Sequence, residues 1–221
     1  MRKVLAAFLV IWAGFAGAQQ QAQAEQVVIA ALGDSLTQGY GLMQSDGFVP
    51  QLEAWLKDQG QDVALINAGV SGDTTAGGLA RAAWTLTPDV DAMIVTLGGN
   101  DLLRGLPPAQ ARANIEGILQ AARDADVEVL LIGMQAPGNF GPDYKAEFDA
   151  IYPDLAQAYG TIFLDSFFAG LSEDGAPADP AALRAWFQAD GIHPNRAGVT
   201  RIVQGIGPSV LALIEAVQAG Q

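Results

Sequence analysis

The stretch that decides how this chain is interpreted is Val27-Val28-Ile29-Ala30-Ala31-Leu32-Gly33-Asp34-Ser35-Leu36. Its first part, 27–32, is short, apolar, β-branched at its start and followed by a glycine, which predicts a buried strand of a parallel sheet. Ser35 comes just after the carboxyl end of this strand, where open α/β sheets place their reactive groups. Ser35 is therefore a candidate nucleophile. The alternative is that Asp34 and Ser35 only cap the following helix, as both residue types commonly do.

Strand-like and helix-like segments alternate along the rest of the chain. Four further apolar runs predict strands, at 62–67, 92–97, 127–132 and 161–164. Spacing and helix-start signals predict helices at 48–57, 74–86, from 107 or 108 onward, 143–159, 180–188 and 195–217. We expect Pro153 to kink or break the helix that contains it, and Gly205-Ile206-Gly207-Pro208 to interrupt the last one. This alternation predicts one α/β domain of three layers, with helices on both faces of a five-stranded parallel sheet.

The first 24 residues have the pattern of a signal peptide. Arg2 and Lys3 precede the apolar segment 4–15, and small residues offer cleavage sites after Ala18 or Ala24. The apolar segment is too short to favour a membrane span, although an uncleaved anchor is the alternative. We therefore expect one domain at 25–221 that is periplasmic or secreted, with no stable membrane span after cleavage.

Composition excludes several classes of function. The 221 residues contain no cysteine, so disulfides and thiolate metal sites are excluded. The formal net charge of -13 disfavours binding to nucleic acid, whose phosphates such a surface repels. Nothing in the chain calls for a metal or a cofactor. We expect a monomer that acts on a small molecule.

One histidine occurs in the whole chain, His193, in a loop that follows the last predicted strand. Asp190 precedes it by three positions with a glycine between them, a spacing that can place the carboxylate against one ring nitrogen. The other nitrogen would then face outward in the tautomer that a general base requires. The alternatives are a structural histidine and an ordinary turn aspartate.

Two more loops offer hydrogen-bond donors for a developing oxyanion. Gly72 offers a backbone N–H and Asn100 a side-chain amide. A turn with positive φ is the alternative for Gly72, and an Asx-turn is the alternative for Asn100. Asp73 and Asp101 are interpreted as helix caps, and so is Asn195, at the start of the last helix.

Taken together, these motifs resemble the four sequence blocks of the SGNH (GDSL) hydrolases. The matching segments are Gly33-Asp34-Ser35-Leu36, Gly72, Gly99-Asn100-Asp101 and Asp190-Gly191-Ile192-His193-Pro194-Asn195. They occur in the family's order, and the chain is most similar to the bacterial thioesterase I/arylesterase/lysophospholipase branch. The resemblance implies a flavodoxin-like sheet of order 2-1-3-4-5. It also implies Ser35 as nucleophile, His193 as base, Asp190 as its orienting partner, and an oxyanion hole of Ser35, Gly72 and Asn100.

The expected activity is that of a serine esterase that hydrolyses carboxylic esters and thioesters through an acyl-enzyme. Aryl esters, acyl esters and lysophospholipids are the expected substrates, because export disfavours the cytoplasmic acyl-CoA. Six residues in or beside the site loops are expected to form an apolar wall for the acyl chain: Leu102, Leu103, Leu106, Pro137, Phe140 and Ile192. The alternatives are a carbohydrate acetylesterase of the same family and a non-catalytic secreted binding protein.

Overall fold

The computed structural model describes residues 26–171 and 183–220. The predicted signal peptide, 1–24, and the first residues of the helix predicted at 180–188 lie outside the described residues. The described part of that helix consists of Leu183, which is α-helical, and a short 3₁₀ helix, η4, at Arg184–Trp186.

A five-stranded sheet forms the centre of the molecule. Its members are β1 Val27–Gly33, β2 Val63–Gly69, β3 Ala92–Thr96, β4 Glu128–Ile132 and β5 Ile162–Leu164. All pairings are parallel and the order is β2-β1-β3-β4-β5, which confirms the predicted order 2-1-3-4-5. Every residue of β3 is buried, because a central parallel strand carries apolar side chains toward both faces.

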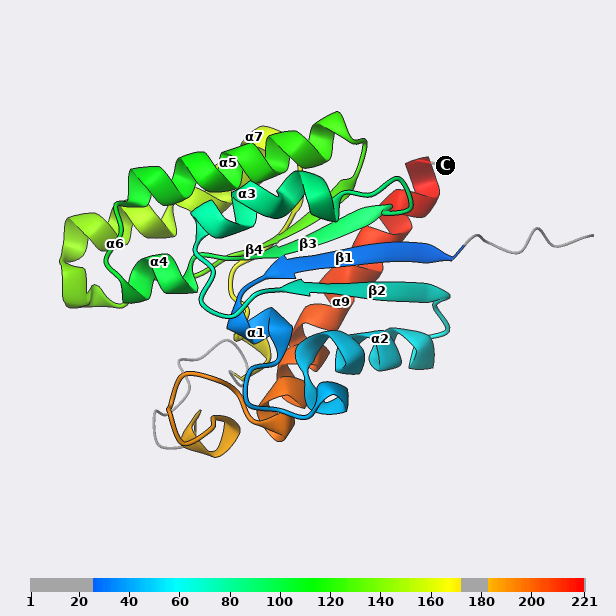
Figure 1. Cartoon of the computed structure of the whole chain (residues 1–221), viewed down its shortest axis with the longest axis horizontal. Helices are drawn as coiled ribbons and strands as arrows, with labels where there is room; N and C mark the ends of the chain where they lie inside the picture. The colour runs from blue at the N-terminus through cyan, green and yellow to red at the C-terminus, as the bar shows by residue number, and fades with distance from the viewer. Residues whose placement is uncertain (1–25, 172–182, 221) are drawn as a thin grey trace, which may run out of the picture.

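Helices cover both faces of the sheet, as predicted (Figure 1). One face carries α3 Thr75–Thr85 and α5 Pro108–Asp124, with α6 Pro142–Asp149 and α7 Ile151–Tyr159 beside them. The other carries α2 Phe48–Asp58 and α9 Arg196–Gly220, which pack against each other. Their buried faces and the strands form one continuous apolar core.

The helix predicted at 143–159 is broken, but not at Pro153. The break lies at Ala150, between α6 and α7. Pro153 falls in the first turn of α7, where a missing backbone N–H has no helical partner to lose. The proline is therefore accommodated near the start of a helix and does not interrupt one.

The last helix, α9, runs without interruption through Gly205-Ile206-Gly207-Pro208, contrary to expectation. The two glycines serve close packing. A Cβ at Gly205 would collide with the backbone at Gly170, and one at Gly207 with the ring of Trp55. Among the described residues, α9 is the one helix long and apolar enough to cross a membrane by length and composition, and ten of its residues are buried against the sheet and its neighbours. That burial is what a core helix requires.

Short elements crowd the carboxyl edge of the sheet. They are α1 Ser35–Gln38, α4 Gly99–Leu103, η1 Gln44–Asp46, η2 Gly138–Phe140, η3 Ala169–Leu171 and η4. At the opposite, amino edge lie the start of β1 and the end of α9 (Figure 1). The sequence motifs therefore gather at one edge and the two ends of the described chain at the other.

Candidate active site

Ser35 is the first residue of α1, directly beyond β1. The chain turns sharply here because Gly33 has no Cβ, which would otherwise collide with the side chain of Thr37 and the carbonyl of Thr96. Asp34 caps the helix by accepting a hydrogen bond from the backbone N–H of Leu36 at 3.0 Å. The turn holds the Ser35 side chain at the carboxyl edge of the sheet, where it lines a cavity.

His193 joins Ser35 to Asp190. Its Nε2 lies 2.9 Å from the Ser35 Oγ, and its Nδ1 lies 2.7 Å from Oδ2 of Asp190. A carboxylate only accepts, so Nδ1 carries the proton and the neutral ring presents Nε2 as an acceptor toward the serine hydroxyl. The arrangement can take the hydroxyl proton onto the imidazole.

Backbone hydrogen bonds within the segment that carries His193 hold it in place. The backbone N–H of Gln188 donates to the His193 carbonyl at 2.7 Å, and that of Asn195 donates to the Trp186 carbonyl at 2.8 Å. Asn195 also accepts from the N–H of Gly198, so it caps α9 as expected. The imidazole is thus held by its own loop as well as by its ring contacts.

Asp190 has a pKa that is lowered to about 2, first by the hydrogen bond from the His193 ring and then by two backbone N–H groups. Its Oδ1 accepts from the N–H of Ile192 at 2.9 Å and from that of His193 at 3.0 Å. Three hydrogen bonds to the ionised form explain the direction of the shift. The carboxylate therefore stays charged throughout the neutral pH range.

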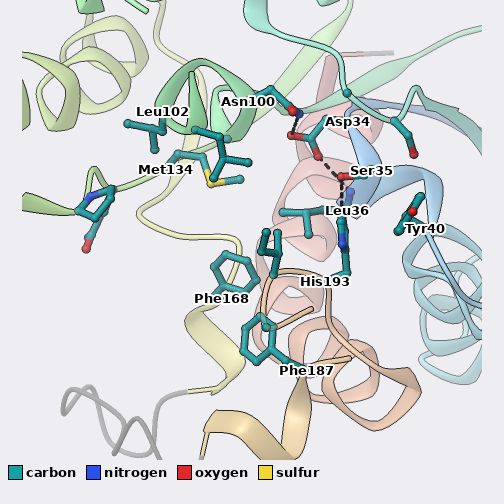
Figure 2. A pocket seen from close by; sticks show the side chains of 18 of the residues that line it. Asp34, Ser35, Leu36, Tyr40, Asn100, Leu102, Met134, Phe168, Phe187 and His193 are labelled. Atoms are coloured by element: carbon teal, nitrogen blue, oxygen red, sulfur yellow. Dashed lines mark hydrogen bonds between the residues drawn. The ribbon is translucent and has the colours of Figure 1, made fainter. Parts of the chain in front are cut away.

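Asp34 is a second carboxylate beside Ser35, and it is only 2% exposed. Its Oδ2 accepts a hydrogen bond of 3.2 Å from Nδ2 of Asn100, in the first turn of α4 (Figure 2). Because an ionised carboxylate has no proton to donate, it fixes the amide with its nitrogen toward Asp34. The second N–H of Asn100 then remains available in the cavity. Burial raises the pKa of Asp34.

Gly72 lines the same cavity as Ser35 and Asn100. Its φ of +84° belongs to the left-handed region that favours glycine, so the turn expected there is present. Arg104 donates from Nη2 to the Gly72 carbonyl at 2.8 Å. This hydrogen bond links the turn after β2 to the loop after β3.

Two buried or half-buried polar groups hold the site loops in register. Arg81 donates to Asp73 at 2.7 Å and to the carbonyl of Gly33 at 2.8 Å, and it also reaches the carbonyl of Ala68. Asp101 accepts from the N–H of Thr75 at 2.8 Å and from its hydroxyl at 2.7 Å. Asp101 thus binds the first residue of α3 from a distant part of the chain. The expectation that Asp73 caps α3 is wrong, because Thr74 occupies the N-cap position and Asp73 binds Arg81.

A cavity of about 600 Å³ opens in front of Ser35. Figure 2 shows Leu102 and Met134 on one side of Leu36, and Phe168 and Phe187 on another. The rings of Phe168 and Phe187 are 5.7 Å apart between centroids. Beyond His193, the Tyr40 ring lies 4.6 Å from the imidazole. The walls are mainly apolar, and Ser35 and His193 line the same cavity.

Four of the six expected wall residues line this cavity: Leu102, Leu103, Pro137 and Ile192. Leu106 and Phe140 do not. The Leu106 carbonyl instead accepts from the Tyr144 hydroxyl at 2.9 Å, and the Phe140 ring packs against that of Tyr144 and over Gly105. The loop after α4 turns away from the cavity before Leu106.

Five other apolar residues line the cavity without having been foreseen, namely Leu36, Tyr40, Met134, Phe168 and Phe187. Leu36 was quoted only as part of a motif. Met134 and Phe168 each follow a predicted strand by a few residues, a position that could have marked them. Tyr40 and Phe187 carried no such signal. Within 26–171 and 183–220, no three His, Cys, Asp or Glu side chains gather as a metal site would require.

Comparisons with known proteins show the family to which the chain belongs. Residues 31–201 match the GDSL-like Lipase/Acylhydrolase family. The chain is 38% identical over 196 residues to "Esterase TesA" of Pseudomonas aeruginosa, covering 88% of this chain and 92% of that protein. It is 38% identical over 168 residues to "Thioesterase 1/protease 1/lysophospholipase L1" of Escherichia coli K12, covering 75% and 74% of the two chains.

A solved structure is also similar. The crystal structure of AlinE4, "a SGNH-hydrolase family esterase", is 41% identical in sequence, with a TM-score of 0.68 over 86% of this chain and 98% of that one. The resemblance noted in the sequence motifs is thus confirmed over nearly the whole described fold. The chain belongs to the GDSL-like lipase/acylhydrolase family, the SGNH hydrolases.

Proposed function

We propose that this protein is an exported serine esterase that hydrolyses carboxylic esters and thioesters of apolar acyl groups. The observation that carries the proposal is the continuous chain of hydrogen bonds from Asp190 through His193 to Ser35, at the mouth of an apolar cavity. The names of the relatives, esterase and thioesterase/lysophospholipase, support the same class of reaction.

The reaction proceeds in two halves. The Ser35 Oγ attacks the acyl carbonyl while its proton passes to Nε2 of His193, and the carbonyl oxygen becomes an oxyanion. The N–H groups of Ser35 and Gly72 and the free N–H of Asn100 donate to that oxyanion. His193 then gives its proton to the leaving alcohol or thiol, and an acyl-serine remains.

Water completes the turnover. His193 takes a proton from a water molecule, the resulting hydroxide attacks the acyl-serine, and the second oxyanion collapses to release the acid and restore the Ser35 hydroxyl. Asp190 stays ionised through both halves and stabilises the imidazolium that forms in each. No step requires a metal or a cofactor.

The apolar lining favours an acyl chain over a sugar in this cavity. Leu36, Leu102, Met134 and the two phenylalanines offer few hydrogen-bond partners for the hydroxyl groups of a carbohydrate. Acyl-CoA is disfavoured as a working substrate by the export expected from residues 1–24. Aryl esters, acyl esters and lysophospholipids are the preferred candidates.

A fluorophosphonate probe tests the proposal. The protein should be labelled at Ser35 and should hydrolyse p-nitrophenyl esters, with kcat/KM higher for octanoate than for acetate. Ser35→Ala should abolish labelling and leave at most the residual acceleration of roughly 10³–10⁴ over water that binding and the oxyanion hole supply. A matched serine, Ser71, lines the same cavity, and Ser71→Ala should keep both labelling and turnover.

The alternatives predict other results. A carbohydrate acetylesterase would favour acetyl groups and lose activity as the acyl chain lengthens. A binding protein would not react with the probe at all. Near-normal turnover by Ser35→Ala would contradict the proposed nucleophile.

A further inference from the structure

Exposed apolar side chains concentrate at the carboxyl edge of the sheet. Eight large hydrophobic side chains are exposed among the described residues. Six of them lie in the segments beyond the carboxyl ends of the strands. We call these six the apolar rim: Tyr40, Met43, Val70, Leu103, Phe140 and Ile192. Tyr40 and Met43 follow β1, and each of the other four follows a different strand. All five connections thus contribute to the rim.

Three rim residues lie at the mouth of the catalytic cavity, and two others are next to cavity residues in the sequence. Tyr40, Leu103 and Ile192 line the cavity and are also exposed outside it. Val70 directly precedes the cavity residue Ser71, and Phe140 directly follows the cavity residue Asn139. Because the carboxyl ends of parallel strands share one edge, the rim residues belong to the edge of the sheet at which the cavity lies.

Such an arrangement is unusual for a surface that meets only water. Leu103 is 65% exposed and Met43 is 74% exposed. Isolated exposed hydrophobic residues are ordinary, but a group of them around a functional site indicates a surface that binds something apolar. The apolar lining continues from the rim down to Ser35, so a ligand on the rim is continuous with one in the cavity.

We propose that the apolar rim docks on the surface of a zwitterionic lipid aggregate, so that an acyl chain passes from the aggregate directly into the cavity. The rim residues come from five separate segments of the chain, whereas a helix or strand of a partner protein docks along a continuous groove or sheet edge. A fluid surface adapts to such separate points. The proposal rests on the proposed function for the fate of the lipid, but not for the docking itself.

Charge selects the kind of lipid. The protein carries a net charge of -13, and an anionic surface would repel it. Arg104, the cation nearest to Leu103 in sequence, already donates to the Gly72 carbonyl. Binding must therefore come from apolar contact, which a zwitterionic headgroup layer permits without electrostatic cost.

Vesicle sedimentation measures the docking, with Ser35→Ala as the background so that no lipid is consumed. We expect this protein to sediment with phosphatidylcholine vesicles and less with vesicles that contain phosphatidylglycerol. Replacing Met43, Val70 and Phe140 by serine should lower the partition coefficient by at least about tenfold, because interfacial affinity scales with buried apolar area. None of these three residues lines the catalytic cavity.

Trp84 supplies a matched control. It is 85% exposed, more than any rim residue, but it lies in the last turn of α3, which leads to the start of β3 at the amino edge. Trp84→Ser should leave the partition coefficient unchanged. Should the triple variant fail to fold because Phe140 packs on Tyr144, the double variant Met43→Ser/Val70→Ser should still lose about threefold.

Activity gives a second measurement, in the protein with Ser35 intact. The triple variant should keep kcat/KM for soluble p-nitrophenyl acetate within about twofold and lose activity on micellar lysophosphatidylcholine in parallel with its partition coefficient. Equal binding by the parent and the triple variant would overturn the proposal, as would absence of binding to phosphatidylcholine. A dimer in sedimentation equilibrium that the triple variant abolishes would assign the rim to a second copy instead. If Ser35→Ala hydrolysed esters normally, the proposed function would fail while the docking result stood.

Discussion

Two aspartates flank Ser35, and their surroundings are opposite. Asp190 lies in a loop, its side chain is 38% exposed, and hydrogen bonds lower its pKa to about 2. Asp34 is buried beneath the turn, and burial raises its pKa. The folded protein thus stabilises the ionised form of Asp190, which contacts His193, and destabilises the ionised form of Asp34, which contacts Asn100. From this difference we expect Asp190 to act through its charge and Asp34 through the orientation it imposes on Asn100.

Of the substitutions that test this comparison, removing the charge of Asp190 should lower kcat the most. In Asp190→Asn, an amide that can also donate replaces a carboxylate that only accepts, so the tautomer of the His193 ring is no longer fixed and kcat should fall by up to about 10⁴. Asp143→Asn, at an exposed position in the first turn of α6, is the matched control and should leave kcat unchanged. A loss of less than tenfold in Asp190→Asn would show that the His193 loop alone positions the ring.

Removing the side-chain amide of Asn100 should lower kcat less. Asn100→Ala deletes one proposed contact to the oxyanion, so kcat should fall by about 10²–10³. KM should change little, because the charge develops only in the transition state. The control is Asn139→Ala, another asparagine that lines the cavity. A large rise in KM at unchanged kcat would instead make Asn100 a group that binds the ground state.

Asp34→Asn should have the smallest effect on kcat, about tenfold, because the one amide oxygen of asparagine keeps the cap on Leu36 and its NH2 group cannot accept the hydrogen bond from Asn100. In the Asn100→Ala background the same substitution should cost almost nothing, because Asn100 is the group on which Asp34 acts. Equal losses in the two backgrounds would show that Asp34 only stabilises the turn. Asparagine is a good N-cap, so the cap on α1 is retained.

The pH dependence of unfolding also separates the two carboxylates. The folded state binds a proton at Asp34 more tightly than the unfolded state does, whose pKa is the ordinary 3.8. Stability therefore falls as pH rises from that value through the raised pKa. Asp190 has the opposite sign, since its lowered pKa makes stability rise between about pH 2 and its ordinary value of 3.8. Thermal unfolding of Asp34→Asn should lack the falling segment and keep the rising one.

Three of the proposed site residues could be grouped from the sequence because each lies within a few positions of a strand end. Ser35, Gly72 and Asn100 follow three strands, and a parallel sheet brings such positions together whatever their separation in the sequence. Asp34 shows the limit of this reasoning. As a helix cap it was predictable from its neighbours, but its contact with Asn100 joins residues 66 positions apart. Only the folded chain reveals that second partner.

The direction of side chains in irregular segments was the second feature that the sequence could not predict. Leu103 and Leu106 belong to one apolar loop, yet only Leu103 faces the cavity. A period of 2 or 3.6 assigns faces in strands and helices, but no such rule applies after Arg104, where the chain leaves α4. The break predicted in α9 at Gly205 and Gly207 was wrong for a related reason. These glycines make room for Gly170 and Trp55, contacts that the sequence does not show.

The opposite placement of the chain ends and the cavity has a practical consequence. β1 begins and α9 ends at the amino edge of the sheet, while Ser35 opens at the carboxyl edge (Figure 1). A linker attached beyond either end of the described chain would hold the enzyme on a solid support with its mouth turned to the solution. Immobilised catalysts often lose activity through random attachment, and this fold offers oriented attachment from both termini.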